Sequence, residues 1–131
     1  MTIGKRLQRL TVHQLHGEVG ERSAVRLRYA GVVDEPRDLL RSVQGVELVE
    51  MERCREDNFC CGAGGARMWM EEENPRINNV RANEALATGA ELISAACPFC
   101  LTMLDDGVKA AKREEEVKVL DLAEILERAT A

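Results

Sequence analysis

Two pairs of cysteines, separated by thirty-five residues, constrain this 131-residue chain more than any other feature. Cys60 and Cys61 are adjacent and run into the glycine-rich stretch 62–65, and Cys97 and Cys100 form a Cys-x-x-Cys pair. The chain has five cysteines, an odd number, and its N-terminus lacks the apolar region of a secretory signal. A disulfide framework is therefore not expected, and clustered thiols in a reducing compartment more often indicate metal or redox chemistry.

From residue 46 onward, the sequence alternates between strand and helix patterns. Residues 46–51, 91–96 and 117–120 are rich in apolar and β-branched side chains and are predicted as strands. Helix-start signals occur at Asp34, Asn74, Pro98 and Asp121. This order predicts an α/β fold, a parallel sheet with crossover helices. The cysteines then fall at the carboxyl ends of strands, where such sheets place ligand sites.

The first third of the chain has a weaker pattern. Residues 3–16 are loosely helical in period, and residues 25–33 alternate in part as a strand does. His13 and His16 would share one face of the N-terminal helix, and no acidic or thiol partner lies nearby in the sequence. We therefore expect histidines that face solvent or are hydrogen-bonded, in preference to half of a metal site.

The composition restricts the partners and the make-up of the core. The net charge is −5 and no basic stripe is interleaved with aromatic residues, so nucleic acid is not an expected partner. No apolar run approaches the roughly 18 residues of a membrane span. We expect a cytoplasmic domain, or one that is peripheral to a membrane through a partner. Aromatic residues make up only 3%, and Trp69 with its flanking methionines is expected in the core, with the shielding of a cofactor as the alternative.

Four cysteines in two tight groups can hold either a tetrahedral zinc ion or an iron–sulfur cluster. Adjacent residues on an extended backbone point in opposite directions, so one zinc ion does not easily use both Cys60 and Cys61. The glycines that follow allow the backbone to curl around a larger group and to turn its amides toward sulfur. The pattern favours a cluster. Zinc, a thioredoxin-like redox pair at Cys97 and Cys100, and inert core thiols remain open.

Two segments carry a resemblance to a known family. They are residues 58–71, Asn-Phe-Cys-Cys-Gly-Ala-Gly-Gly-Ala-Arg-Met-Trp-Met-Glu, and residues 96–104, Ala-Cys-Pro-Phe-Cys-Leu-Thr-Met-Leu. Both closely resemble the cysteine-rich "CCG" domain that occurs in heterodisulfide reductase, in the iron–sulfur subunits of glycolate oxidase and anaerobic glycerol-3-phosphate dehydrogenase, and in lactate-utilisation proteins. Residues 76–78 and 84–90 look most like membrane-associated iron–sulfur oxidoreductases linked to electron-transfer flavoprotein. The resemblance covers roughly residues 31–126.

The resemblance implies an α/β domain that binds a [4Fe–4S] cluster, a noncubane one in some members and zinc in others. Carried over to this chain, the ligands would be Cys60, Cys61, Cys97 and Cys100, with Gly62, Gly64 and Gly65 lining the cofactor. The implied function is an electron-transfer module, a subunit or domain of an iron–sulfur oxidoreductase. It would relay electrons between a flavoprotein, a 2-hydroxy-acid dehydrogenase or another iron–sulfur redox subunit and a quinone or disulfide acceptor. The alternative is a zinc-bound or metal-free interaction domain.

The chain departs from the family pattern in two respects. The family has another cysteine, in a His-Asp-Pro-Cys-like stretch, at the position that falls on Ala24, so a five-thiolate noncubane cluster is not expected. Cys54 has no family counterpart, and a stand-in role for the missing ligand is the minor alternative to a plain thiol. Family members also usually carry a ferredoxin-like domain ahead of this one. We expect a divergent segment over residues 1–30 and the cysteine-rich domain over residues 31–131, together one compact unit.

Overall fold

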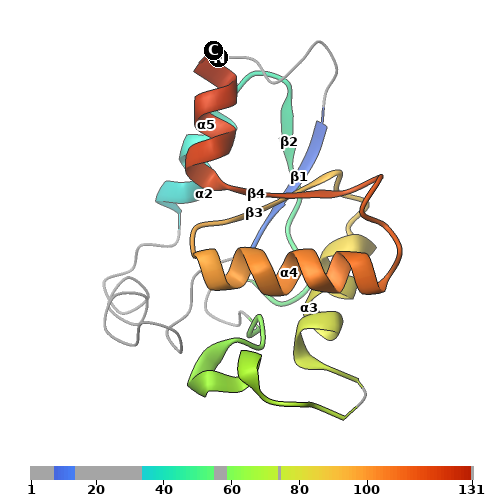
Figure 1. Ribbon diagram of the computed structural model, residues 1–131. Helices are drawn as coiled ribbons and strands as arrows, with labels where there is room; N and C mark the ends of the chain where they lie inside the picture. Colours follow the sequence, from blue (N-terminus) through green and yellow to red (C-terminus); the bar gives the residue numbers. More distant parts are fainter. Residues whose placement is uncertain (1–7, 14–33, 55–58, 74, 131) are drawn as a thin grey trace.

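The computed structural model describes residues 8–13, 34–54, 59–73 and 75–130 (Figure 1). Within these ranges, four strands form one sheet in the order β2-β1-β3-β4, and every pairing is parallel. The strands are β1 (Gln8–Val12), β2 (Val46–Leu48), β3 (Leu92–Ala95) and β4 (Lys118–Asp121). The helices are α2 (Glu35–Arg41), the 3-10 helix η2 (Gly64–Trp69), α3 (Ile77–Ala87), α4 (Pro98–Ala110) and α5 (Leu122–Thr130).

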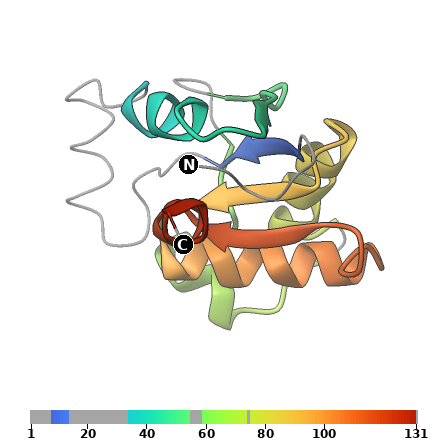
Figure 2. The same cartoon turned by 90° about the horizontal axis from the view of Figure 1, so that it is seen from above.

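Helices cover both faces of the sheet, with α3 and α4 below it and α2 and α5 above it in Figure 1. In the view from above, α5 is seen end-on at the carboxyl ends of β3 and β4 (Figure 2). Successive residues of a strand point to opposite faces, and each face has its own core cluster. The cluster under α2 and α5 consists of Leu10, Val12, Leu40, Leu92 and Ile125. Ile93 and Ala95 of β3 belong to the other cluster, with residues of α3 and α4. The predicted α/β fold is confirmed.

Two sequence predictions of secondary structure have contrasting outcomes. The helix predicted at Asp34 is α2, with Asp34 as its N-cap residue and a proline in its first turn. The helix predicted over residues 3–16 is wrong, because residues 8–12 form β1, which pairs with β2 on one side and β3 on the other. Pairing on both sides of a central strand outweighs a weak local helical period. The predicted strand at 25–33, Ala24 and His16 lie outside the described residues.

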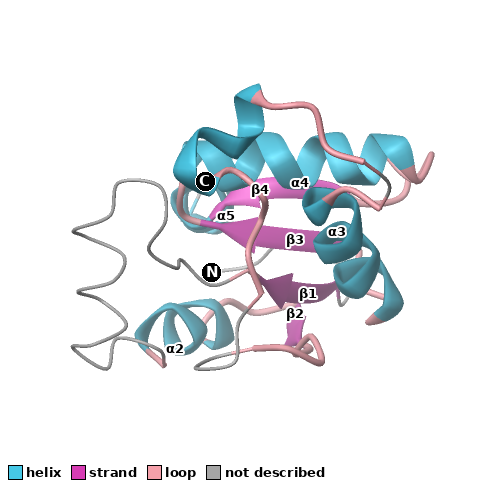
Figure 3. Cartoon of the chain, turned by 90° about the horizontal axis from the view of Figure 1, so that it is seen from below, coloured by secondary structure: helices cyan, strands magenta, loops and turns pink. Residues whose placement is uncertain are grey.

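The carboxyl end of β1 is the point where the order of the strands reverses. From β1 the chain reaches β2 on one side, then crosses through α3 to β3 on the other side. His13 follows β1, and its backbone N–H donates to Ser94 O at 2.8 Å, so His13 lies level with the end of β3. Figure 3 shows the neighbouring ends of β1 and β3 from below. Parallel α/β sheets bind ligands at such a switch point, and here it lies beside Cys97 and Cys100.

No helix in the described part of the chain combines the length and apolar character needed to cross a bilayer.

The contact between α3 and α4 depends on the absence of a side chain at Gly107. A Cβ atom there would lie 2.5 Å from Ala82 Cβ and 2.9 Å from Asn78 O, both on α3. We expect Gly107→Ala to lower the free energy of unfolding by about 1–3 kcal/mol, because overpacking of this kind forces the two helices apart. The loss should appear despite the better helix propensity of alanine, which alone would add about 1 kcal/mol.

Urea unfolding followed by circular dichroism measures this change, with Asp106→Ala on the exposed side of the same helix as the matched control. If Gly107→Ala were as stable as the parent, the close approach of α3 and α4 would not contribute to stability.

Candidate metal centre

Cys61 and Cys100 meet in the core below the sheet. Their sulfurs are 3.4 Å apart and share a hydrogen bond, and both side chains are buried. The separation is well above the roughly 2.05 Å of a disulfide bond, and all five cysteines are free thiols. Cys61 precedes η2 and Cys100 lies in the first turn of α4, so two segments distant in the sequence bring one thiol each to the same place.

His13 completes a three-residue donor set with these thiols. One ring nitrogen and the two sulfurs all lie within 4.8 Å of one another, and all three side chains are buried. Of the two environments predicted for this histidine, solvent exposure is wrong and a hydrogen-bonded position is found, since His13 accepts from Arg81 Nε. The thiol partners that are missing from its sequence neighbourhood are present in space. The burial of His13 could have been predicted from the pattern Leu10-Thr11-Val12-His13. If this segment is a strand, Thr11 and His13 lie on the face opposite Leu10 and Val12.

Cys60 lies beside this set and is positioned by the glycine turn. The backbone N–H of Gly62 donates to Cys60 Sγ at 3.2 Å, as expected for an amide turned toward sulfur. Gly62 has φ +90°, and a Cβ atom there would lie 3.1 Å from Asn78 N, so both the backbone conformation and the packing favour glycine. Gly64 and Gly65 begin η2, which continues the turn.

Cys97 and Cys54 lie outside the three-residue donor set. Cys97 is the N-cap residue of α4, half-buried and packed against the core cluster that contains Cys61 and Cys100. Cys54 is half-buried, lies after β2, and is close enough to Arg81 to influence its pKa. The structure thus brings Cys61 and Cys100 into contact, with Cys60 next to Cys61 and Cys97 one turn before Cys100.

The protein holds Cys61 in its protonated form. The hydrogen bond with Cys100 raises the pKa of Cys61 to about 12, and burial acts in the same direction, while hydrogen bonds with Cys60 and the backbone of Ala63 partly oppose the rise. Thiolates, not thiols, bind metals. Metal binding at Cys61 must therefore release a proton, and affinity should increase with pH.

A buried network of charged residues lies behind His13. Arg81 of α3 is fully buried, and its Nε–H donates to His13 Nδ1 at 2.9 Å while Nη1 donates to Arg53 O at 2.8 Å. Glu84 Oε1 lies 3.2 Å from Arg81 Nη1. Burial lowers the pKa of Arg81 and the carboxylate of Glu84 opposes this effect. Burial alone would raise the pKa of Glu84, but its hydrogen bonds with Arg53 and the charge of Arg81 bring it below the ordinary value.

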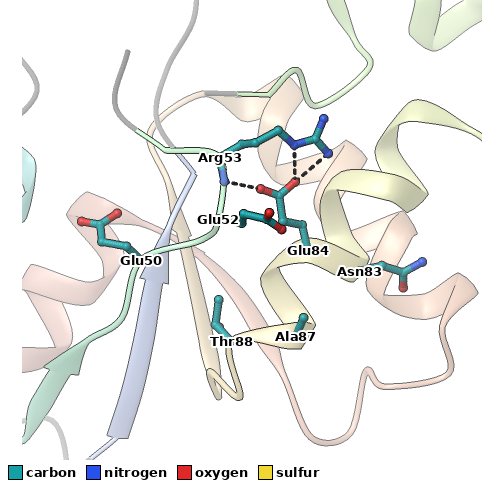
Figure 4. A pocket seen from close by; sticks show the side chains of 7 residues that line it. All are labelled: Glu50, Glu52, Arg53, Asn83, Glu84, Ala87 and Thr88. Atoms are coloured by element: carbon teal, nitrogen blue, oxygen red, sulfur yellow. Dashed lines mark hydrogen bonds and ion pairs between the residues drawn. The ribbon is translucent and has the colours of Figure 1, made fainter. Parts of the chain in front are cut away.

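The same network anchors the chain just before the Cys60–Cys61 pair. Glu84 accepts three hydrogen bonds from Arg53, one from the backbone N–H at 2.6 Å and two from the guanidinium at 2.8 and 3.0 Å. The Arg53 guanidinium also stacks 3.7 Å from the centre of the Phe59 ring. Figure 4 shows Arg53 and Glu84 joined by these hydrogen bonds, and both line a pocket of about 500 Å³. This arrangement ties Phe59, the residue before Cys60, to α3 through Arg53.

The prediction that Trp69 belongs to the core is wrong. Its side chain is 77% exposed and Met70 is 60% exposed, whereas Met68 packs against the core cluster with Cys61 and Cys100. The short 3-10 helix turns residues 68 and 69 to different sides, so that only one of them reaches the core.

Comparison with known proteins agrees with the cysteine pattern. The family described as the cysteine-rich domain (CCG) matches residues 25–105. The chain is 51% identical over 116 residues to a protein of Bacillus subtilis described as a probable iron-sulfur-binding oxidoreductase, FadF. It is 48% identical over 110 residues to EtfAB:quinone oxidoreductase of Syntrophomonas wolfei, and 39% identical over 103 residues to a subunit of the dihydromethanophenazine:CoB--CoM heterodisulfide reductase of Methanosarcina barkeri.

These alignments cover 87%, 78% and 78% of this chain but only 16%, 15% and 25% of the three relatives. The chain therefore spans a small part of their length. No solved structure matches the chain significantly. Because the family match extends over more than half of the chain and includes both cysteine pairs, the chain belongs to the CCG family of cysteine-rich domains.

Proposed function

We propose that this chain is the cluster-binding, electron-transfer domain of an iron–sulfur oxidoreductase. The observation that carries the proposal is the contact between the buried thiols of Cys61 and Cys100 at the switch point of a parallel sheet. The relatives support it, since the two most similar of those named above are described as an iron-sulfur-binding and a quinone oxidoreductase. An iron–sulfur cluster supplies a centre that accepts and donates single electrons.

The residues present fit such a cluster. The donors are soft thiols, which suit iron–sulfur clusters and zinc. The proposed ligands are Cys60, Cys61, Cys97 and Cys100, which would hold a [4Fe–4S] cluster, with the turn at Gly62, Gly64 and Gly65 along one side. The Gly62 N–H that already donates to Cys60 Sγ, and the buried Arg81 cation behind His13, would both offset the negative charge of thiolates.

The proposal extends to the electron donor and acceptor, and the descriptions of two relatives as a quinone oxidoreductase and a heterodisulfide reductase support the acceptor. The electron donor would be a flavoprotein, a 2-hydroxy-acid dehydrogenase or another iron–sulfur subunit, and the acceptor a quinone or a disulfide. The domain would work in the cytoplasm, or at a membrane through its partner. Exposed Trp69 and Met70 follow the Cys60–Cys61 turn, so they offer apolar surface near the proposed cluster.

Anaerobic purification followed by iron and acid-labile sulfide analysis tests the proposal. We expect iron and sulfide in equal amounts, about four of each per chain for a [4Fe–4S] cluster. A colourless chain that takes up neither, even after reconstitution, would rule out the proposed function. Stoichiometric zinc without sulfide would assign the thiols to a structural ion instead.

A further inference from the structure

His13 is the only nitrogen ligand candidate in the donor set, and its neighbours determine which chemistry it can perform. Arg81 Nε–H donates to His13 Nδ1 at 2.9 Å. Arginine has donors only and stays protonated in proteins, so Nδ1 must supply the lone pair of this bond. A neutral histidine carries one ring proton, and that proton then resides on Nε2, which is buried and makes no hydrogen bond with the described residues.

This tautomer matters because metal ligation and hydrogen-bond donation require opposite forms of a nitrogen. A metal ligand needs a free lone pair, whereas an N–H group can only donate. Arg81 occupies the lone pair of Nδ1, and the proton on Nε2 occupies the remaining nitrogen. The ring in this orientation has no lone pair to offer a metal. It has one N–H, in a ring of which one nitrogen lies within 4.8 Å of the sulfurs of Cys61 and Cys100.

We propose that, once Cys61 and Cys100 are thiolates that hold the cluster, His13 donates an Nε2–H hydrogen bond to one of their sulfurs, and that Arg81 acts as the positioning residue that holds His13 in the donating tautomer. The hydrogen bond to sulfur rests on the proposed function, whereas the tautomer follows from the contact with Arg81 and does not depend on it. Arg81 is held in turn by Glu84 and the Arg53 carbonyl, so the donor is fixed by a chain of buried contacts from α3 to the end of β1.

A hydrogen bond from an N–H group to a ligand sulfur stabilises the reduced, more negative state of a cluster and therefore raises its reduction potential. We expect His13→Leu to assemble the cluster with a lower midpoint potential. The equilibrium constant for reduction should fall roughly tenfold, which corresponds to about 59 mV for a one-electron couple. His13→Gln is the matched variant, because its side-chain amide can present an N–H at a similar reach, and its potential should stay close to that of the parent.

Potentiometric titration of the reconstituted full-length chain distinguishes the outcomes. A lower potential in His13→Leu that is largely restored in His13→Gln supports the proposal. An unchanged potential in His13→Leu overturns it. Two results together would also overturn the proposal: both variants lose the cluster, and the parent shows the large nitrogen hyperfine coupling of a ligated histidine. His13 would then be a ligand.

A second measurement is independent of iron. In the full-length chain prepared without iron, 15N NMR of the histidine side chains should show the Nε2–H tautomer for His13, and His16→Gln assigns the signal because the chain has two histidines. Arg81→Met should remove this preference. An Nδ1–H tautomer in the parent overturns the inference. If the parent assembles no cluster but shows the Nε2–H tautomer, the proposed function fails and only the tautomer assignment stands.

Discussion

Cys61→Ser and Cys100→Ser are each expected to reduce the iron and sulfide content of the anaerobically purified chain to a tenth or less. Loss of a partner that merely supports a ligand costs about 10–100-fold in metal affinity, and loss of the ligand itself should cost at least as much. Serine nearly preserves the shape of the side chain but replaces a soft thiolate with a hard oxygen donor. The two buried thiols are in contact, so either substitution should disrupt the same centre.

Cys54→Ser is the matched control, since Cys54 is a half-buried thiol outside the three-residue donor set. We expect it to keep its iron and sulfide. Circular dichroism of each variant separates loss of cluster from loss of fold. Full iron and sulfide in Cys61→Ser and Cys100→Ser would contradict the proposed ligands, and a loss confined to Cys54→Ser would assign a ligand role to that residue instead.

The part of the fold that could be predicted from the sequence has strong local signals. The strand β3 is a run of four buried residues, and α4 begins at a proline directly after Cys97, so both appear in the pattern without tertiary information. The strand β1 lacks such local signals. It begins with Gln8 and Arg9 and alternates polar Thr11 with apolar neighbours, and its place in the centre of the sheet depends on pairing with strands distant in the chain.

The same distinction applies to the site. Cysteine pairs are visible because few other functions account for four clustered thiols in a chain of this kind. The link between His13 and Arg81 joins residues 68 positions apart, and each alone has an ordinary structural interpretation: a histidine in a polar stretch and an arginine on a helix. Only the fold shows that the polar side of β1 and the inner side of α3 face each other. Polar residues that are buried together leave no apolar period from which to predict their burial.

Arg81→Met is expected to lower the free energy of unfolding by about 3 kcal/mol. The substitution leaves His13 Nδ1 and the Arg53 carbonyl oxygen without the donors that they now have at 2.9 and 2.8 Å, and each buried acceptor that is left unsatisfied costs about 1–3 kcal/mol. Methionine fills much of the volume and removes the cost of burying a charge, which moderates the loss. Glu84 keeps its hydrogen bonds with Arg53, so no unpaired carboxylate is created.

Urea unfolding of the full-length chain measures the change, and Arg41→Met is the control. Arg41 is half-exposed in its ion pair with Asp38, so its replacement should change stability by no more than about 0.5 kcal/mol. Equal stability of Arg81→Met and the parent would show that the buried network makes no net contribution to the fold.

A double-mutant cycle with His13→Leu identifies where the contribution of Arg81 arises. If Arg81 acts mainly through the imidazole, its removal should cost less once His13 is leucine, and the two effects should be non-additive by about 1 kcal/mol or more. Additive effects would instead place the contribution of Arg81 in its contacts with Arg53 and Glu84. The role of Arg81 would then be to anchor the loop that contains Arg53, and the tautomer of His13 would need another cause.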